Sequence, residues 1–399
     1  MEQKLVRWPH VVRGFIIYLF VGLIYAWSIF VVPLEEAFGW VRSDTSNIFS
    51  VVVVFFSIGG LLGGVMRKRM SVKNVVRIAA LMMMVGFIAS SWVTQLYQFF
   101  ITYGAVCSTG VGICYTCVSG AVLKWFPDKV GTINGTLFLG YGLASMAFGW
   151  LINLMLGLLG WRVTFFALGV AFGVVIMAAV HKLEVPDENT VLPAAVVKKS
   201  ITVFPDVDYT TRETLKRPTF WKISVWATLL CAGGYAVFGG VSPAITGLGA
   251  SLSFGAVAAG LSSLSNGVSR VIWGRLYDKT GLKVTEISVS VVFIVGCALA
   301  MVGVYFVNIP LTVVAFMISC FGFGGVPTCA TTTINKMYGK KYYETNLSAY
   351  MIACIPSGFL GPALSGVLVT ASGSYFSTYA VMLVAAIIAL LIAFNIRKP

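Results

Sequence analysis

Arg270 is the one ionisable side chain that the sequence places well inside a long apolar segment. The other charged side chains fall in polar stretches or at the ends of apolar segments. Asn266 precedes Arg270 by four residues, which puts both side chains on one face of a helix. A planar guanidinium pairs with both oxygens of a carboxylate, so this arrangement predicts a carboxylate-binding site.

The charge of Arg270 has no evident partner in the sequence. An unpaired arginine at the centre of a membrane helix costs roughly 2.5 to 3.5 kcal/mol on insertion scales. No Asp, Glu or His lies deep in another apolar segment, so we expect the anion to be a small carboxylate substrate. The structural alternative is snorkelling, because Arg275 follows after about 7.5 Å of helix rise and long side chains near helix ends reach the interface.

Aromatic side chains near the middle of other apolar segments are candidates to complete such a site. Tyrosine hydroxyls can donate to a second carboxylate oxygen or to a substrate hydroxyl. Packing and interface belts are the more common roles of aromatic residues in membrane helices. The candidates of this kind are Tyr25, Tyr115, Tyr141, Tyr235, Phe323 and Tyr350.

The elements that must position these residues are membrane helices. The 399 residues are 58% hydrophobic and only 11% charged, which excludes an ordinary soluble domain. A helical span needs about 20 apolar residues, and the absence of alternating ten-residue segments excludes a barrel. We expect twelve helical spans, starting near Val11, Asn47, Val75, Tyr97, Gly131, Arg162, Phe220, Phe254, Glu286, Ile309, Tyr342 and Tyr375.

The net charge of +14 reports topology rather than a nucleic-acid partner. With the N-terminus inside, nearly all Lys and Arg residues between predicted spans fall on the cytoplasmic side, and only Arg42 and Arg162 fall outside. Under the positive-inside rule this bias places both termini in the cytoplasm.

A polar stretch, residues 182–219, divides the chain into predicted halves 1–181 and 220–399. The halves repeat: Gly110-x-Gly112 and Lys124 recur as Gly322-x-Gly324 and Lys336, at an offset of 212 residues. An even number of spans per half gives both repeats the same orientation. The predicted fold is an all-α integral membrane protein with twelve transmembrane helices in two parallel six-helix repeats.

The segment from Gly274 to Gly281 resembles the GxxxD(R/K)xG loop of the major facilitator superfamily. Its counterpart after the second span has Lys68 at the aspartate position and Ser71 at the second glycine. In that family the loop is thought to latch the inward gate, so the resemblance implies a gate that works mainly from the second half. The gating residues it implies are Gly274, Asp278, Lys279 and Gly281.

Four segments, 25–36, 110–115, 124–136 and 265–281, resemble the oxalate/formate antiporter and monocarboxylate transporter group of that superfamily. The resemblance makes Arg270 the group's eighth-helix arginine and matches Tyr25, Tyr115 and Phe323 to pocket aromatic residues.

The chain departs from that group at two informative positions. Cys354 stands where the oxalate carrier has a second cation, a lysine, so one fixed positive charge favours a monoanion over a dianion. Asn266 stands where animal monocarboxylate transporters have an aspartate, and an asparagine cannot carry a coupling proton.

We therefore expect a secondary active transporter of small monocarboxylates such as lactate or pyruvate, proton-coupled and working by alternating access. The alternative is an oxalate/formate-type anion exchanger, and a transport-dead carboxylate sensor is less favoured. We expect no enzyme activity, cofactor or metal, and a lipid-embedded monomer in a bacterial or archaeal inner membrane. The predicted substrate-binding residues are Arg270, Asn266, Tyr25, Tyr115, Phe323, Cys354, Tyr350 and Tyr141.

Overall fold

The computed structural model describes residues 7–23, 27–40, 42–187, 190, 192 and 207–396, and the secondary structure of these residues is helical. Tyr25 lies outside the described residues.

The first six spans are built from α1 (Trp8–Val21), α2 (Trp27–Phe38), α3 (Arg42–Met66), α4 (Val72–Ser90), α5 (Leu96–Phe99), the π-helix η2 (Phe100–Cys107), α6 (Ser108–Leu123) and α7 (Val130–Val180). The remainder comprises α8 (Thr211–Leu215), α9 (Pro218–Gly247), α10 (Leu252–Thr280), α11 (Leu282–Tyr305), α12 (Ile309–Tyr338), α13 (Tyr343–Ala353), α14 (Ile355–Ser372) and α15 (Phe376–Phe394).

These helices agree with the twelve predicted spans, and each predicted start lies within several residues of an observed one. Among the described residues, nine helical stretches are long and apolar enough to cross a membrane. One of them, α7, holds two predicted spans joined at Gly160, whose φ of 75° lies in the left-handed region that favours glycine. The chain therefore passes between its fifth and sixth spans without a loop.

By its internal contacts the chain forms two compact units. Unit 1 comprises Met1–Asp128, Thr136–Ala195 and Tyr343–Ile352, and unit 2 comprises Lys129–Gly135, Val196–Tyr342 and Ala353–Pro399. The first turns of α7 thus group with unit 2, and most of α13 groups with unit 1. The predicted division at 182–219 stays a prediction.

Unit 1 packs through glycines that let helix backbones approach closely. A side chain at Gly112 of α6 would meet the backbone oxygen of Phe56 in α3, and one at Gly59 of α3 would meet that of Thr109. Small residues at such crossings are the usual way in which membrane helices associate. Helix α6 is consequently buried along its whole length.

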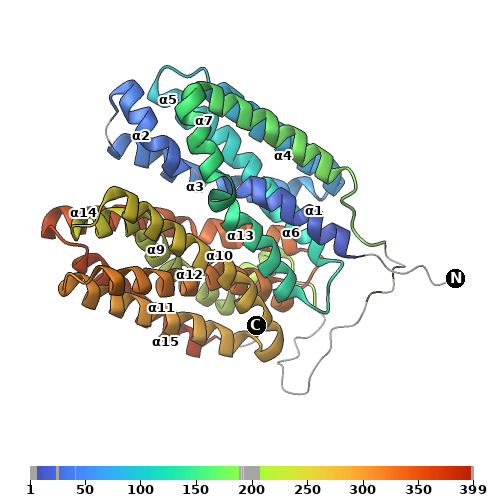
Figure 1. The fold of residues 1–399 in the computed structure, drawn as a ribbon. Coiled ribbons are helices and arrows are strands. Elements are labelled where there is room, and N and C mark those ends of the chain that lie inside the picture. The colour runs from blue at the N-terminus through green and yellow to red at the C-terminus, as the bar shows by residue number, and fades with distance from the viewer. Residues whose placement is uncertain are drawn as a thin grey trace. The chain divides into compact units, whose positions relative to one another are not determined.

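Unit 2 contains α9 to α12, α14 and α15. Helix α11 packs against both α12 and α15, and these three helices lie side by side in Figure 1. Glycines again set the spacing, since a side chain at Gly296 of α11 would meet Ser319 of α12. This packing positions α10, which carries Arg270 and Asp278.

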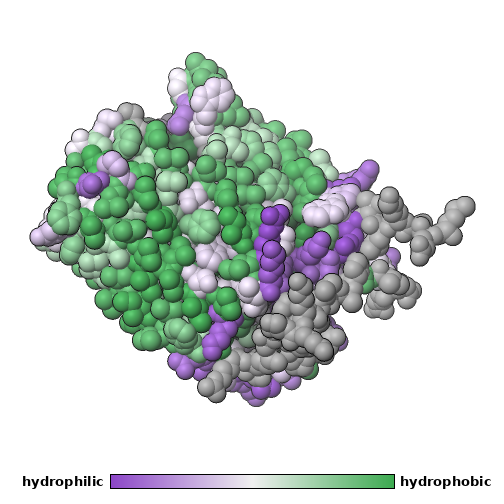
Figure 2. Space-filling model, turned by 60° about the horizontal axis from the view of Figure 1, so that its bottom comes forward, coloured by the Kyte–Doolittle hydropathy of each residue, from purple (hydrophilic) through white to green (hydrophobic). Residues whose placement is uncertain are grey.

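The surface of the chain suits a hydrocarbon environment. Figure 2 shows one face covered largely by hydrophobic residues, with hydrophilic side chains gathered toward the lower right. Large apolar side chains are exposed on several helices, among them Trp150 at 75% and Val367 at 66%. Apolar exposure of this extent requires lipid contact, so the protein is a multi-pass membrane protein.

Candidate functional site

Arg270 lies in the interior of unit 2, where 4% of its surface is exposed. Its Nε and Nη2 both donate hydrogen bonds to Oδ1 of Asn266, at 3.3 and 3.0 Å. The helical spacing of four residues produces this pair, as the sequence predicts. The neutral amide of Asn266 therefore orients the buried guanidinium.

Asn266 is itself fixed from the other side. Its Nδ2 donates a 3.0 Å hydrogen bond to the backbone oxygen of Cys320 in α12. Both polar atoms of the amide are used within unit 2, and its exposure is 2%. In this structure Asn266 positions the guanidinium, and its predicted role in binding the substrate stays a prediction.

Other predicted site residues lie near Arg270 in unit 2. The thiol of Cys231 in α9 is close enough to both Arg270 and Cys354 to interact electrostatically with each. Cys354 is half-buried at the start of α14. One helical turn beyond Cys231, Tyr235 packs edge-on against Phe323 of α12, with ring centroids 5.3 Å apart. Unit 2 thus places two thiols near the cation and a pair of aromatic rings one helical turn farther along α9.

The predicted tyrosines of unit 1 form an aromatic cluster. The ring of Tyr115 stacks on Phe138 with centroids 5.1 Å apart and lies edge-on to Tyr141 at 5.8 Å. Tyr18 of α1 completes the cluster, because its hydroxyl donates a 2.6 Å hydrogen bond to the backbone oxygen of Tyr115. Tyr350 belongs to α13 of the same unit and is 6% exposed.

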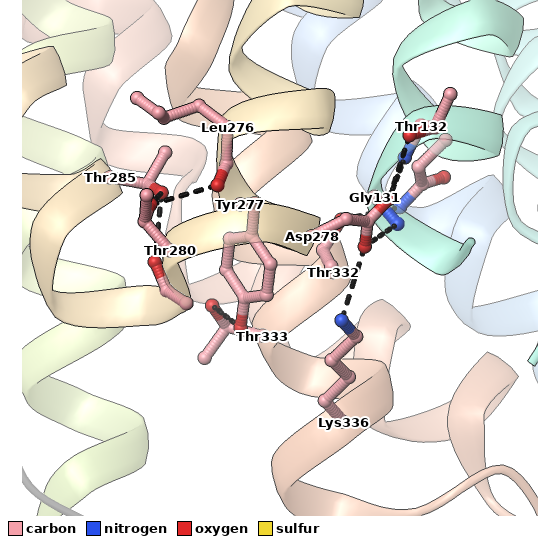
Figure 3. Close-up of polar contacts among 12 residues, drawn as sticks. Gly131, Thr132, Leu276, Tyr277, Asp278, Thr280, Thr285, Thr332, Thr333 and Lys336 are labelled. Carbon is pink, nitrogen blue, oxygen red and sulfur yellow. Dashed lines mark hydrogen bonds and ion pairs between the residues drawn. The ribbon is translucent and has the colours of Figure 1, made fainter. Parts of the chain in front are cut away.

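The segment predicted as a gating loop is helical up to Thr280, where α10 ends. Within it, Asp278 holds the first turn of α7 (Figure 3). Its carboxylate accepts hydrogen bonds from the backbone amides of Gly131 and Thr132, at 3.0 and 2.7 Å. It also accepts one from the Thr132 hydroxyl at 2.8 Å and pairs with Lys336 of α12 at 3.2 Å. A carboxylate at a helix N-terminus is stabilised by the free amides and the helix dipole.

Glycines make the approach of α7 to α10 possible. Side chains at Gly131 and Gly135, four residues apart on α7, would meet the backbone oxygens of Gly274 and Arg270. A side chain at Gly274 would in turn meet the backbone oxygen of Gly131. Of the other predicted gating residues, Gly281 separates α10 from α11 with a φ of 83°, and Lys279 is exposed.

Unit 1 contains an ion pair whose lysine stands at the matching place in the repeat. Lys124, the counterpart of Lys336, lies 3.5 Å from Glu344 in the first turn of α13. The carboxyl group of Glu344 packs against Gly120 of α6, where an added side chain would meet it. Ser348 of α13 donates a 2.6 Å hydrogen bond to the backbone oxygen of Gly60 in α3. The start of α13 is thereby attached to unit 1.

The sequence reasoning missed Tyr18, Glu344 and the role of Lys336. Lys336 carried a usable signal, because the offset of 212 residues pairs it with Lys124. The signal for Glu344 was weaker. The offset of 212 residues aligns Glu344 with Thr132, whose hydroxyl donates a hydrogen bond to Asp278.

The arrangement of helices agrees with a family match over most of the chain. Residues 14–359 match the model of the Major Facilitator Superfamily. The chain belongs to this superfamily. It is a transporter rather than an enzyme.

Relatives in this superfamily share about a quarter of their residues with the chain. The uncharacterized MFS-type transporter YhjX of Escherichia coli (strain K12) is 25% identical over 347 residues, covering 84% of this chain and 81% of YhjX. The oxalate:formate antiporter of Oxalobacter formigenes is 24% identical over 374 residues, covering 92% and 86%. Monocarboxylate transporter 13 of Rattus norvegicus is 21% identical over 363 residues, covering 90% and 81%.

Solved structures confirm the fold. The proton:xylose symporter XylE superposes with a TM-score of 0.77 at 13% identity, covering 98% of this chain and 96% of that one. FucP in its outward conformation gives 0.72 at 11% identity, covering 98% and 99%. The predicted fold class, twelve helices in the major facilitator arrangement, is therefore confirmed.

Proposed function

We propose that the protein carries small monocarboxylates and that Arg270 binds the substrate carboxylate. The observation that carries this proposal is a buried guanidinium whose Nε and Nη2 are both oriented by the amide oxygen of Asn266. A carboxylate is the small anion whose two oxygens match the planar donors of a guanidinium. The names of the oxalate:formate antiporter and of monocarboxylate transporter 13 support the same substrate class.

A single negative charge on the substrate fits the chemistry around Arg270. The resemblance places a second cation at position 354, where this chain has a cysteine. The Cys354 thiol interacts electrostatically with Cys231 of α9, which also interacts with Arg270. A second carboxylate enclosed there would carry a large desolvation cost without a cationic partner. We therefore favour lactate, pyruvate, acetate or formate over oxalate.

Binding of a monoanion also supplies a reason for movement. Substrate neutralises Arg270, which lowers the cost of enclosing the charge in an apolar setting. The Asp278 contacts to the start of α7, together with Lys336, then act as the gate of an alternating-access cycle. We place the protein in the inner membrane of a bacterial or archaeal cell with both termini in the cytoplasm, because of its positive loops.

Uptake by proteoliposomes tests the role of Arg270. Losing a buried charged partner costs about 2 to 5 kcal/mol, so Arg270→Ala should lower uptake by at least about 30-fold. Arg270→Lys keeps the charge without the planar fork and should be intermediate. Arg275→Ala is the matched control, because that exposed arginine lies on the same helix. Wild-type uptake by Arg270→Ala would refute the proposal.

The substrate is identified by a thermal-shift screen of the purified protein against lactate, pyruvate, formate, acetate and oxalate, followed by flux with the best ligand. A shift with oxalate alone would contradict the preference for monoanions.

Anion exchange is the second candidate, favoured by the similarity to the oxalate:formate antiporter over 92% of this chain. The two modes differ in what drives accumulation. Proton symport requires that a pH gradient alone concentrates the substrate in empty proteoliposomes, whereas exchange requires an internal anion.

A further inference from the structure

Glu286 is a fully buried carboxyl group in unit 2. It is the fifth residue of α11 and has 0% exposure. Within the described part of the chain neither of its carboxyl oxygens has a hydrogen-bond partner. By position in the sequence Glu286 counts as terminal in its span, and it does lie in the first turns of α11, where its side chain is nevertheless fully buried.

The groups packed around Glu286 are neutral. Its electrostatic neighbours are Tyr277 of α10 and Cys329 of α12. On the α9 side the indole of Trp226 donates to the hydroxyl of Ser290, one turn along from Glu286. The buried face of the adjoining half of α15 consists of Ala386, Ala389 and Ala393.

Cationic side chains do not compensate Glu286. Among the ion pairs of the described residues, the acid that belongs to unit 2 is Asp278, which pairs with Lys336. Glu286 takes part in none of these pairs. Burying a carboxylate without a partner is costly, and such a group is stable only when it holds a proton.

We propose that Glu286 is a proton-binding site. In the packing seen here it is the neutral acid, and it becomes a carboxylate when its O–H bond breaks and the proton passes to water. Its role in coupling rests on the proposed carboxylate transport: in a symporter this group takes up a proton and releases it once per cycle.

Tyr277 links Glu286 to the gate. Lys336 Nζ lies 5.0 Å from the centre of the Tyr277 ring and 3.2 Å from Asp278. The Tyr277 hydroxyl shares a 3.1 Å hydrogen bond with Thr333 of α12 (Figure 3). Tyr277 interacts electrostatically with both Glu286 and Asp278.

The charge of Glu286 therefore bears on the ion pair that holds α7. While Glu286 is neutral, Asp278 is the anion that attracts Lys336. Loss of the proton adds a second anion beside Tyr277, whose ring also lies near Lys336.

Infrared spectroscopy of the purified protein tests the proton site without any substrate. The wild type should show the carbonyl stretch of a protonated carboxylic acid at neutral pH, and Glu286→Gln should lose that band. Asp187→Asn, at an exposed position, is the control and should retain it. Absence of the band in the wild type, or its persistence in Glu286→Gln, would overturn the proposal. Glu286→Leu should also lose the band, which decides the outcome if Glu286→Gln does not fold.

Flux tests the coupling separately. In proteoliposomes the wild type should accumulate monocarboxylate in response to a pH gradient, and Glu286→Gln should lose this response. A full response in the variant would exclude Glu286 as the coupling group. If the wild type carries no carboxylate at all, the proposed function fails, while the infrared band still decides whether Glu286 binds a proton.

Discussion

Glu344 pairs with Lys124 in unit 1 as Asp278 pairs with Lys336 in unit 2, but the acid comes from a different place in the repeat. In unit 2 the acid stands near the end of α10, and in unit 1 it stands in the first turn of α13. The loop position corresponding to Asp278 is Lys68. Unit 1 has therefore kept the ion pair although its loop has lost the aspartate.

Breaking the unit 1 pair should open the region around Cys117. This thiol has 0% exposure and interacts with Glu344 and Lys124. Glu344→Gln should cost about 1 to 2 kcal/mol, between a surface and a buried pair, and so raise maleimide labelling of Cys117 about tenfold. The measurement uses a protein in which the other seven cysteines are alanine.

The charge-swapped variant Lys124→Glu/Glu344→Lys is the control for this experiment, since it restores an ion pair with opposite polarity. Its labelling rate should return toward that of the parent. Equal labelling of the parent and Glu344→Gln would show that the pair does not protect Cys117.

Gly135→Ala should disturb the contact between α7 and α10. The new methyl group would meet the backbone oxygen of Arg270, and overpacking of this kind costs about 1 to 3 kcal/mol. Gly157→Ala is the matched control on the same helix, because nothing lies within 4 Å of the added carbon. The melting temperature and the uptake rate should both fall in Gly135→Ala and stay unchanged in Gly157→Ala. A Gly135→Ala variant as stable as the wild type would mean that α7 and α10 can separate without cost.

Cys354→Lys should shift substrate preference toward dicarboxylates. The lysine would add a second cation close to Cys231, a residue that also interacts with Arg270. Competition of oxalate against a monocarboxylate in the thermal-shift and flux assays measures the change. Cys354→Met, which adds length without charge, is the control. No gain in oxalate binding would count against placing position 354 at the substrate.

The stabilising effect of Glu184 should depend on pH. A 2.7 Å hydrogen bond from Lys73 lowers the pKa of this carboxyl group below its ordinary value. A carboxyl group whose pKa falls on folding stabilises the folded state above its unfolded pKa, and loses that effect as the pH falls through its folded pKa.

Glu184→Gln should therefore lower the melting temperature at neutral pH and match the wild type in acid. Because 61% of the Glu184 side chain is exposed, we expect a cost of only a few tenths of a kcal/mol. Asp187→Asn provides the background effect of removing one acid. A destabilisation that persisted in acid would point to packing instead of charge.

The fold and the Arg270–Asn266 pair were predictable because both depend on local sequence. Helical spans follow from the length of apolar segments, and a spacing of four residues brings two side chains together wherever the helix lies. The cluster of Tyr18 with Tyr115 was not predictable, since it joins residues 97 positions apart. Gating by Asp278 and substrate binding by the predicted residues remain predictions.

The burial of Glu286 shows where sequence position misleads. Lys283, three residues earlier in α11, is exposed, whereas Glu286 has 0% exposure. Helical periodicity held the better signal, because Glu286 shares a face with Leu282, Val289 and Phe293, all buried. Whether a helix end is wetted or covered depends on neighbouring helices, which no local pattern describes.

Gly160 has a mechanical consequence for the chain. A connection of one left-handed residue between two long helices leaves no slack, and the first helix after it is tied to α4 where Arg162 donates a 3.0 Å hydrogen bond to the backbone oxygen of Ser91. The two halves of α7 are therefore joined directly, and a single glycine sets the angle between the fifth and sixth spans.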